Sequence, residues 1–589
     1  MSIFAIPFLL IFPGYLITIF LSSISGFFKR LAFSVVLSVS LEVVLSYLLV
    51  FFNSSLIHYF LLLMTGIILI LLVLGWKLES SAGLKGNGIT NKGMTKIMVI
   101  VKEWKALQKK EKIFFVVILT LSLAVGIFVF YPHFQYLWPI HADEWWDVSA
   151  VESVLQGRPL NTNPYLLTPY PDYKPGFTSL LAGVFSGGIE PVKAWAYLPA
   201  LNLFMISFIV SLLLYDKTKN FWVAGLVPLF LAAIRSNAYV LGWWFFVPSM
   251  FALLFVLFLL LTVEDLLKNF WSGLVIVGVI SASLGLVYLP FLGFLFLSFI
   301  PLIPKLFQRF PVVFIIVLFL VIISIITLLF LSPYKSFWPQ SAPLLLKSFF
   351  VPIDATPAMI KFLGFFKVVP IVLFLLAICG FWFLRKTNWS KSLLTAGIMG
   401  LVFLLIIYFG GISFLAFYQR EFYFLGVVVA ILASVGCGTF LLKVKMPNIL
   451  RWFAAALVIF MIFWGYFNLP GGTLLYYLVT PADFKALTWL KSQSNLQNMR
   501  VLSNAFTGTI VTPLSGLPVA VAGLTSQGVG IGNDLMQSSS FFNTTNCTIK
   551  KNIMIVFNAQ IVYGNIPQNC SFLKEVYAKD GIFIYKRVL

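Results

Sequence analysis

Asp143 and Glu144 form the pair of side chains in this sequence best suited to chemistry. They belong to the stretch 141–147, HADEWWD, which follows an apolar run over 113–131 that is long enough to cross a bilayer. Acidic side chains are costly at membrane depth, and beside tryptophans that favour the interface they indicate a functional site. A carboxylate in this position could act as a general base toward a hydroxyl group.

The residues after this pair predict a short helix over 147–155. Its apolar residues recur at helical spacing on one face, namely Val148, Val151, Val154 and Leu155. We expect this helix to lie at the membrane surface, with Asp143 and Glu144 in the non-helical approach to its N-terminus. Acidic residues also stabilise helix N-termini, so capping is the structural alternative to catalysis for both side chains.

The composition is that of a polytopic membrane protein. Of the 589 residues 60% are hydrophobic and only 10% are charged, whereas soluble domains carry about 25% charged residues. The net charge of +21 comes from Lys and Arg residues that lie mostly in short segments between apolar runs. The preference of basic residues for cytoplasmic loops explains that pattern better than nucleic-acid binding, for which no motif is present.

The most basic loop, 77–112, is placed in the cytoplasm by this rule, which puts the N-terminus and Asp143 outside. Further basic segments must then return to the cytoplasm, at 216–219, 305–309, 385–391 and 443–451. This requires that 272–302 form two spans broken near Pro290. The count is then about fourteen spans, beginning with a retained span over 3–21, in a multi-pass protein of the cell membrane. Outward segments are predicted at 132–193, 235–239, 332–359 and 410–421.

Four parts follow from this reading. They are an N-terminal three-helix membrane extension (1–76), the basic cytoplasmic loop (77–112), a membrane core (113–469) with the outer loop 132–193, and an extracytoplasmic α/β domain (470–589). The fold class is therefore a polytopic α-helical membrane protein with a small C-terminal α/β domain.

Local patterns in the last part predict its elements. Thr480 followed by Pro481 is typical of a helix start. Strands are predicted at 500–503, 517–522, 553–557, 561–563 and 582–585. Cys547 and Cys570 lie in this polar region, and an outside location would favour a disulfide between them.

The motifs of the outer loop resemble the GT-C superfamily of lipid-phosphate-sugar-dependent glycosyltransferases. The resemblance consists of the Asp-Glu pair, the helix ending in Gly-Arg-Pro-Leu (157–160), and Tyr-x-Lys-Pro-Gly before the next span. The ending Val-Tyr-x-x-Asp-Gly-x-x-Ile-Tyr (576–585) is similar to the outer domains of bacterial and archaeal members. Protein O-mannosyltransferases and the aminoarabinose transferase of lipid A are relatives. The resemblance covers roughly 113–589, and the three preceding spans are an addition to the usual core.

The resemblance implies roles for individual residues. Asp143 would be the base toward an acceptor hydroxyl while the sugar is displaced, with inversion, from a polyprenyl phosphate. Glu144 would position Asp143 or the acceptor, or be the base itself. A carboxylate near a dry interface is expected to have a raised pKa. Cations for the phosphate are sought in Lys174, Arg420, Arg235 and Arg158, each of which could instead be a snorkelling or lipid-binding residue. Arg420 could also simply pair with Glu421.

The predicted function is transfer of a sugar from a polyprenyl (dolichyl-type) phosphate donor to a protein, lipid or glycan acceptor outside the cytoplasm. No cofactor is expected to be required. A divalent metal remains an alternative, with His141 and Asp143 as candidate ligands, because oligosaccharyltransferases of the same superfamily use one. Two other functions stay open. One is a transporter or flippase of lipid-linked saccharides, and the other is a metal-dependent oligosaccharyltransferase-like enzyme.

Overall fold

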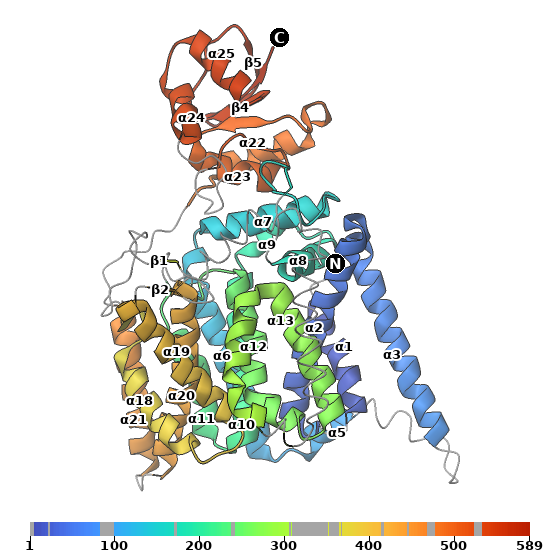
Figure 1. Cartoon of the computed structure of the whole chain (residues 1–589), viewed down its shortest axis with the longest axis vertical. Coiled ribbons are helices and arrows are strands. Elements are labelled where there is room, and N and C mark those ends of the chain that lie inside the picture. The colour runs from blue at the N-terminus through green and yellow to red at the C-terminus, as the bar shows by residue number, and fades with distance from the viewer. Residues whose placement is uncertain are drawn as a thin grey trace.

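The chain is a bundle of apolar helices that carries a small α/β domain on one end (Figure 1). The computed structural model describes residues 5–21, 24–82, 99–169, 174–236, 242–304, 368–410, 418–443, 447–467, 477–522 and 533–588, with isolated positions at 308, 351–352, 365–366 and 412–413. The predicted outward segment 332–359 lies almost entirely outside these residues. The end of the bundle that carries the α/β domain is called the C-terminal face below.

Within the described residues, 8 helical segments are long and apolar enough to cross a membrane. They fall in α2 (Phe27–Phe52), α3 (Phe60–Ala82) with the preceding turn, α6 (Lys109–Val129), α10 (Leu198–Thr218), α12 (Pro248–Leu266), α13 (Phe270–Ser298), α19 (Lys391–Gly410) and α20 (Tyr418–Lys443). Shorter apolar helices are α1 (Ala5–Phe20), α8 (Pro175–Phe185), α11 (Phe221–Ala232) and α18 (Ile371–Leu384), and α21 (Asn448–Phe467) follows α20. The predicted class, a polytopic helical membrane protein, is confirmed. The predicted count of about fourteen spans includes segments that the structure does not describe.

The predicted break near Pro290 is present, but it does not give two separate spans in the described residues. α13 (Phe270–Ser298) consists of two helical pieces that meet at a kink, where Tyr288 leaves helical geometry (φ −158°, ψ 90°), and together they form one apolar stretch of 29 residues. Pro290 follows two residues later. A proline removes an N–H donor and crowds the preceding turn, so the helix is interrupted there and the chain continues in the same stretch.

Three basic side chains, among them Lys217 of the predicted cytoplasmic segment 216–219, meet at the end of the bundle opposite the C-terminal face. The ammonium groups of Lys29 and Lys268 lie 3.8 and 2.8 Å from Asp265 carboxylate oxygens, and Lys217 pairs with the same carboxylate. Segments at the ends of α2, α10 and α12 are therefore brought to one side, as the alternation of spans requires.

The N-terminal helices differ in how they join the bundle. α2 is packed into the bundle, and 56% of its apolar stretch is buried. α3 leans away from the bundle, and only 22% of its apolar stretch is buried (Figure 1). At Gly176, in the first turn of α8, an added Cβ would lie 2.6 Å from Leu286 Cβ and 2.9 Å from Val43 Cγ1. Only glycine allows α2, α8 and α13 to approach so closely, and this contact fixes where α8 begins.

The C-terminal domain is built on a four-stranded sheet of order β3-β4-β6-β5. Its strands are β3 (Val501–Ser503), β4 (Ile561–Gly564), β5 (Leu573–Lys579) and β6 (Ile582–Arg587), and its helices are α22 (Pro481–Ser492), α23 (Ala505–Ser515), α24 (Asn533–Asn543) and α25 (Cys547–Val556). β3 and β4 are parallel, while β6 pairs antiparallel with both β4 and β5.

Several predicted elements of this domain are confirmed, and others are not. The helix start at Thr480, the strands near 500–503, 561–563 and 582–585 are all present. The strand predicted at 553–557 is wrong, because Asn546 caps a helix that continues to Val556. The run 517–522 forms only an isolated bridge, between Val519 and Val501. Strand β5 was not predicted.

The predicted disulfide is confirmed, since Cys547 and Cys570 are bonded across 23 positions of the sequence. It ties the start of α25 to the segment before β5. We expect the double variant Cys547→Ser/Cys570→Ser to lose about 3 kcal/mol of unfolding free energy, because the bond restricts the unfolded chain. The measurement is the melting temperature of purified protein, with reductant added to the wild type as a second route to the open form. Equal melting temperatures in all three samples would contradict this expectation.

Candidate active site

The helix that carries the acidic pair begins earlier than predicted. α7 runs from Ala142 to Leu155, so Asp143 and Glu144 lie in its first turn and not in the approach to it. His141 is the N-cap, and its Nδ1 accepts a hydrogen bond of 3.1 Å from the backbone N–H of Asp143. Histidine is an unusual residue to begin a helix, which is why the first five residues of α7 were missed.

α7 is not an open surface helix, because it lies between the bundle and the C-terminal domain (Figure 1). Glu152 on α7 forms an ion pair with Lys491 on α22. The hydroxyl of Tyr165 donates to the Thr509 carbonyl oxygen at 3.1 Å, and the backbone N–H of Val519 donates to the Tyr165 carbonyl oxygen at 3.0 Å. The expected amphipathic helix therefore buries its polar face under the domain as well.

Glu144 accepts hydrogen bonds from three backbone N–H groups of two separate segments. It is fully buried, and its Oε2 accepts hydrogen bonds from the backbone N–H groups of Ile140 and His141 at 3.0 and 3.1 Å. Its Oε1 accepts from the N–H of Phe246 at 2.8 Å. The carboxyl group thus joins the start of α7, which carries Asp143, to the segment before α12.

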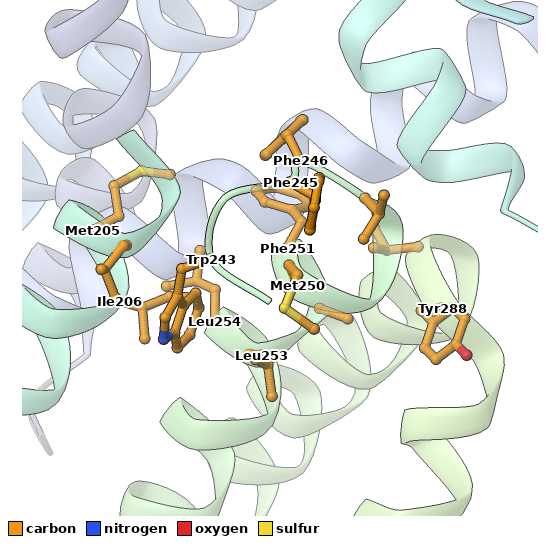
Figure 2. Packing of buried hydrophobic residues seen from close by; sticks show 14 of the residues in the cluster. Met205, Ile206, Trp243, Phe245, Phe246, Met250, Phe251, Leu253, Leu254 and Tyr288 are labelled. Carbon is orange, nitrogen blue, oxygen red and sulfur yellow. The ribbon is translucent and has the colours of Figure 1, made fainter. Parts of the chain in front are cut away.

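The segment before α12 is itself held rigidly. Figure 2 shows Phe245, Phe246 and Phe251 packed together where the chain enters α12. The ring of Phe245 lies 5.1 Å from that of His141, edge to face, and the Phe246 ring lies 5.3 Å from Phe177 on α8. Such contacts add about 0.5–1.5 kcal/mol each beyond their buried area. They therefore fix the backbone group that Glu144 binds.

Asp143 is paired with Arg420, 277 residues further along the chain. Arg420 Nη2 lies 3.2 Å from Asp143 Oδ2, and the two side chains are 13% and 29% exposed. Tyr288, at the kink of α13, also lies close enough to Arg420 to interact with it electrostatically. The first turn of α7, the start of α20 and the kink of α13 therefore converge on one point at the C-terminal face.

The pKa of Asp143 differs from the expectation. Burial acts to raise it, but the nearby His141, Arg420 and Lys174 together hold the pKa below its ordinary value. The expected raised pKa is therefore wrong for Asp143, because the neighbouring cations outweigh the dry surroundings. Asp143 is a carboxylate at neutral pH and is ready to accept a proton, although it is a weaker base than a raised pKa would make it.

Lys174 lies deeper and has its own partner. It is the residue before α8, and its ammonium group forms an ion pair with Asp147 on α7, with the two side chains only 2% and 1% exposed. Burial lowers the pKa of Lys174, while the charge of Asp143 acts in the opposite direction. Lys174 thus adds positive charge to the surroundings of Asp143 from a buried position.

The other two predicted cations lie elsewhere. Arg158 follows α7, and its Nη2 donates to the Gly516 carbonyl oxygen at 3.3 Å, which ties it to the C-terminal domain. Arg235 is buried just after α11, and its backbone N–H donates to the Val368 carbonyl oxygen at 2.9 Å. Among the described residues, the ion pair of Asp143 is with Arg420 and with neither of these two.

Two residues of the site were not singled out from the sequence. Asp147 lies in the same stretch as Asp143, one helical turn later, and that spacing was an available signal. Tyr288 stands two residues before Pro290, and only the folded chain shows that it lies near Arg420. Across the part of the chain that is described, no group of three or more His, Cys, Asp or Glu residues is arranged to hold a metal ion.

We expect Glu144→Gln to destabilise the protein by about 1–3 kcal/mol, because an amide offers one acceptor oxygen to N–H groups that now bind two. Burial raises the pKa of Glu144 to about 8, although the backbone N–H groups that it binds act in the other direction. Between its ordinary value near 4.5 and about 8, the folded protein therefore holds a proton that the unfolded chain releases. The stability that Glu144 contributes then falls as the pH rises through this window.

The measurement is thermal unfolding of wild type and Glu144→Gln at several values between pH 5 and pH 8. The gap between their melting temperatures is expected to shrink as the pH rises. A gap that stays constant or widens would show that Glu144 does not titrate in this window.

Comparisons with known proteins give weak likenesses. No protein-family model matches the sequence, and no curated protein matches it. Among solved structures, the chain is similar to the archaeal oligosaccharyltransferase AglB from Archaeoglobus fulgidus in complex with an inhibitory peptide and a dolichol-phosphate, at 13% identity over 77% of this chain and 70% of that one, with a TM-score of 0.40. It is also similar to the Archaeoglobus fulgidus oligosaccharyltransferase in the apo form (13% identity, 76% and 69% covered, TM-score 0.35) and in complex with Zn and sulfate (12%, 76% and 67%, 0.33).

Proposed function

We propose that this chain is a membrane glycosyltransferase of the GT-C type. It transfers a sugar from a polyprenyl (dolichyl-type) phosphate donor to a protein, lipid or glycan acceptor at the C-terminal face. The resemblance of the outer-loop motifs to that superfamily suggests the reaction. The single observation that carries the proposal is the partly exposed Asp143 carboxylate beside Arg420, where an acid–base group and a phosphate-binding group occupy one site.

The chemistry follows from this pairing. Asp143 takes the proton of the acceptor hydroxyl as the acceptor oxygen bonds to the anomeric carbon of the sugar. The bond from that carbon to the phosphate oxygen breaks, and its electron pair leaves with the polyprenyl phosphate. Arg420 stabilises the phosphate charge, since guanidinium groups bind phosphate oxygens in a bidentate manner. Glu144 and the segment before α12 hold Asp143 in place, and Lys174 adds positive charge.

The carboxylate needs no large pKa shift for this role. Displacement at an anomeric carbon passes through a transition state with oxocarbenium character, so the attacking hydroxyl becomes acidic late in the reaction. A carboxylate that is fully ionised at neutral pH is then available in every molecule. What the site must supply is its orientation, which the buried Glu144 contacts provide.

The test is turnover of a panel of radiolabelled polyprenyl-phosphate sugars by the purified protein in lipid nanodiscs. The expected result is consumption of at least one donor and release of polyprenyl phosphate in proportion. A parallel sample with EDTA separates the metal-dependent alternative, since loss of activity that Mn²⁺ or Mg²⁺ restores would favour an oligosaccharyltransferase-like enzyme. No turnover of any donor would contradict the proposal.

One observation favours transport as the second candidate function. Glu42 lies within the membrane-spanning α2 at 3% exposure, and its Oε1 has no hydrogen-bond partner among the described residues. Buried ionisable groups in spans often mark ion or proton pathways. Vesicles that contain the protein and a lipid-linked saccharide distinguish the two functions. Movement of saccharide across the bilayer that is lost in Glu42→Gln, without donor consumption, would replace the transferase proposal.

A further inference from the structure

The C-terminal domain contains a cavity of about 320 Å³ that shares no residue with the site around Asp143. One wall is formed by residues at or directly after the ends of β3 and β4, at 504–507 and 564–566. These two strands are parallel neighbours, so their carboxyl ends open at the same edge of the sheet. In α/β domains this edge is where ligands commonly bind, because the loops diverge there and leave a crevice.

The second wall is one face of α24. Leu535, Ser539, Phe542 and Asn543 line the cavity, at the spacing that places side chains on one side of a helix. The ring of Phe542 also meets the sheet, since a Cβ added at Gly564 would lie 3.0 Å from its Cε1 atom. The cavity therefore lies between two elements of regular structure, the sheet and α24.

The lining has a distinct chemistry. Five of its side chains carry amide or hydroxyl groups, namely Asn504, Thr507, Ser539, Asn543 and Asn565. Two others, Phe506 and Phe542, present aromatic rings, and none of the lining side chains that the structure describes carries a charge. Amides and hydroxyls both donate and accept hydrogen bonds, so they suit a neutral ligand that bears many hydroxyl groups.

The size and the polarity narrow the class of ligand. Pockets for small molecules span about 300–1,000 Å³, and this one lies at the lower end. A phosphate would need a cation, and the described lining side chains carry none. An extended peptide would need a longer groove with an open strand edge. A neutral sugar offers hydroxyl groups to the amides and an apolar ring face to Phe506 or Phe542.

We propose that this cavity is a binding site for an uncharged saccharide of one or two sugar units. It would hold a glycan on the C-terminal domain, separate from the reacting groups around Asp143. The site concerns binding alone, so the result of its test does not depend on whether Asp143 is a catalytic base.

The test uses full-length protein in nanodiscs. It is made in a host without N-glycosylation, because Asn543-Thr544-Thr545 fits the N-glycosylation pattern and Asn543 must stay unmodified. Saturation-transfer NMR is recorded with methyl glycosides of glucose, mannose, galactose and N-acetylglucosamine and with their disaccharides. At least one should bind. Ser539→Trp fills the cavity from an exposed helix position and should weaken that binding at least tenfold.

The matched control is Ser540→Trp, which places the same ring on the next residue of α24, outside the cavity lining. It should bind as the wild type does, and the melting temperatures of both variants show whether each is folded. Asn565→Ala, which removes one amide from an exposed loop position, should weaken binding to a smaller extent. Absence of binding by every saccharide, equal binding by Ser539→Trp and wild type, or preference for an uncharged peptide over all saccharides would each overturn the proposal.

Discussion

Asp143→Asn is expected to lower kcat/KM for the polyprenyl-phosphate sugar at least about a hundredfold, at the low end of what a general base contributes. The amide keeps the size of the carboxyl group and can still accept a hydrogen bond from Arg420, but it cannot take the acceptor proton. Binding of the donor should change much less, because Arg420 remains. The measurement is steady-state donor consumption together with donor affinity for the same two proteins.

The matched control for this prediction is Asp580→Asn, which makes the same chemical change in an exposed turn of the C-terminal domain, 45% exposed and far along the chain from α7. Its activity should equal that of the wild type. If Asp143→Asn keeps more than about half of the wild-type rate, Asp143 is not the base. Glu144 would then be tested in the same way, because it was the second candidate from the sequence.

Lys174→Met is expected to cost about 3–5 kcal/mol of unfolding free energy, because it leaves the Asp147 carboxylate buried without its cation. The double variant Asp147→Asn/Lys174→Met removes both charges and should recover most of the loss. The measurement is the melting temperature of each variant in the same detergent.

Lys193→Met serves as the control for this second prediction. Lys193 also pairs with a carboxylate, that of Glu190, but its side chain is 63% exposed, and surface pairs contribute about 0–1 kcal/mol. A small effect of Lys174→Met, similar to that of Lys193→Met, would contradict the buried pair. A double variant as unstable as the single one would show that Lys174 stabilises the fold through other contacts.

Parts of the architecture could be predicted because their causes are local. Apolar runs long enough for a bilayer predict spans, and a cap followed by proline predicts α22. The errors arose where two local tendencies compete. The run 553–557 is rich in β-branched residues, yet the side chain of Asn546 caps the helix that contains it. The break expected near Pro290 is present at Tyr288, but the two helical pieces on either side form one span and not two.

The candidate site was predicted only in its local part. Asp143 and Glu144 could be found because they stand together at the end of a span. The different environments of Asp143 and Glu144 could not be predicted from the sequence. Glu144 binds the segment before α12, while Asp143 pairs with Arg420. Arg420 was one of four candidate cations. It lies 277 positions from Asp143 in the sequence, and no local pattern indicates which of the four contacts Asp143. Long-range packing of α7, α13 and α20 decides that choice.

The central claim is that an acceptor oxygen, activated by Asp143, displaces polyprenyl phosphate directly from the anomeric carbon of the sugar. The most direct test is the anomeric configuration of the first product, determined by NMR from a donor of known configuration under single-turnover conditions. One displacement predicts a product with the configuration inverted. Retention of the donor's configuration would contradict the account, because it requires a second displacement that the proposed arrangement of Asp143 and Arg420 does not provide.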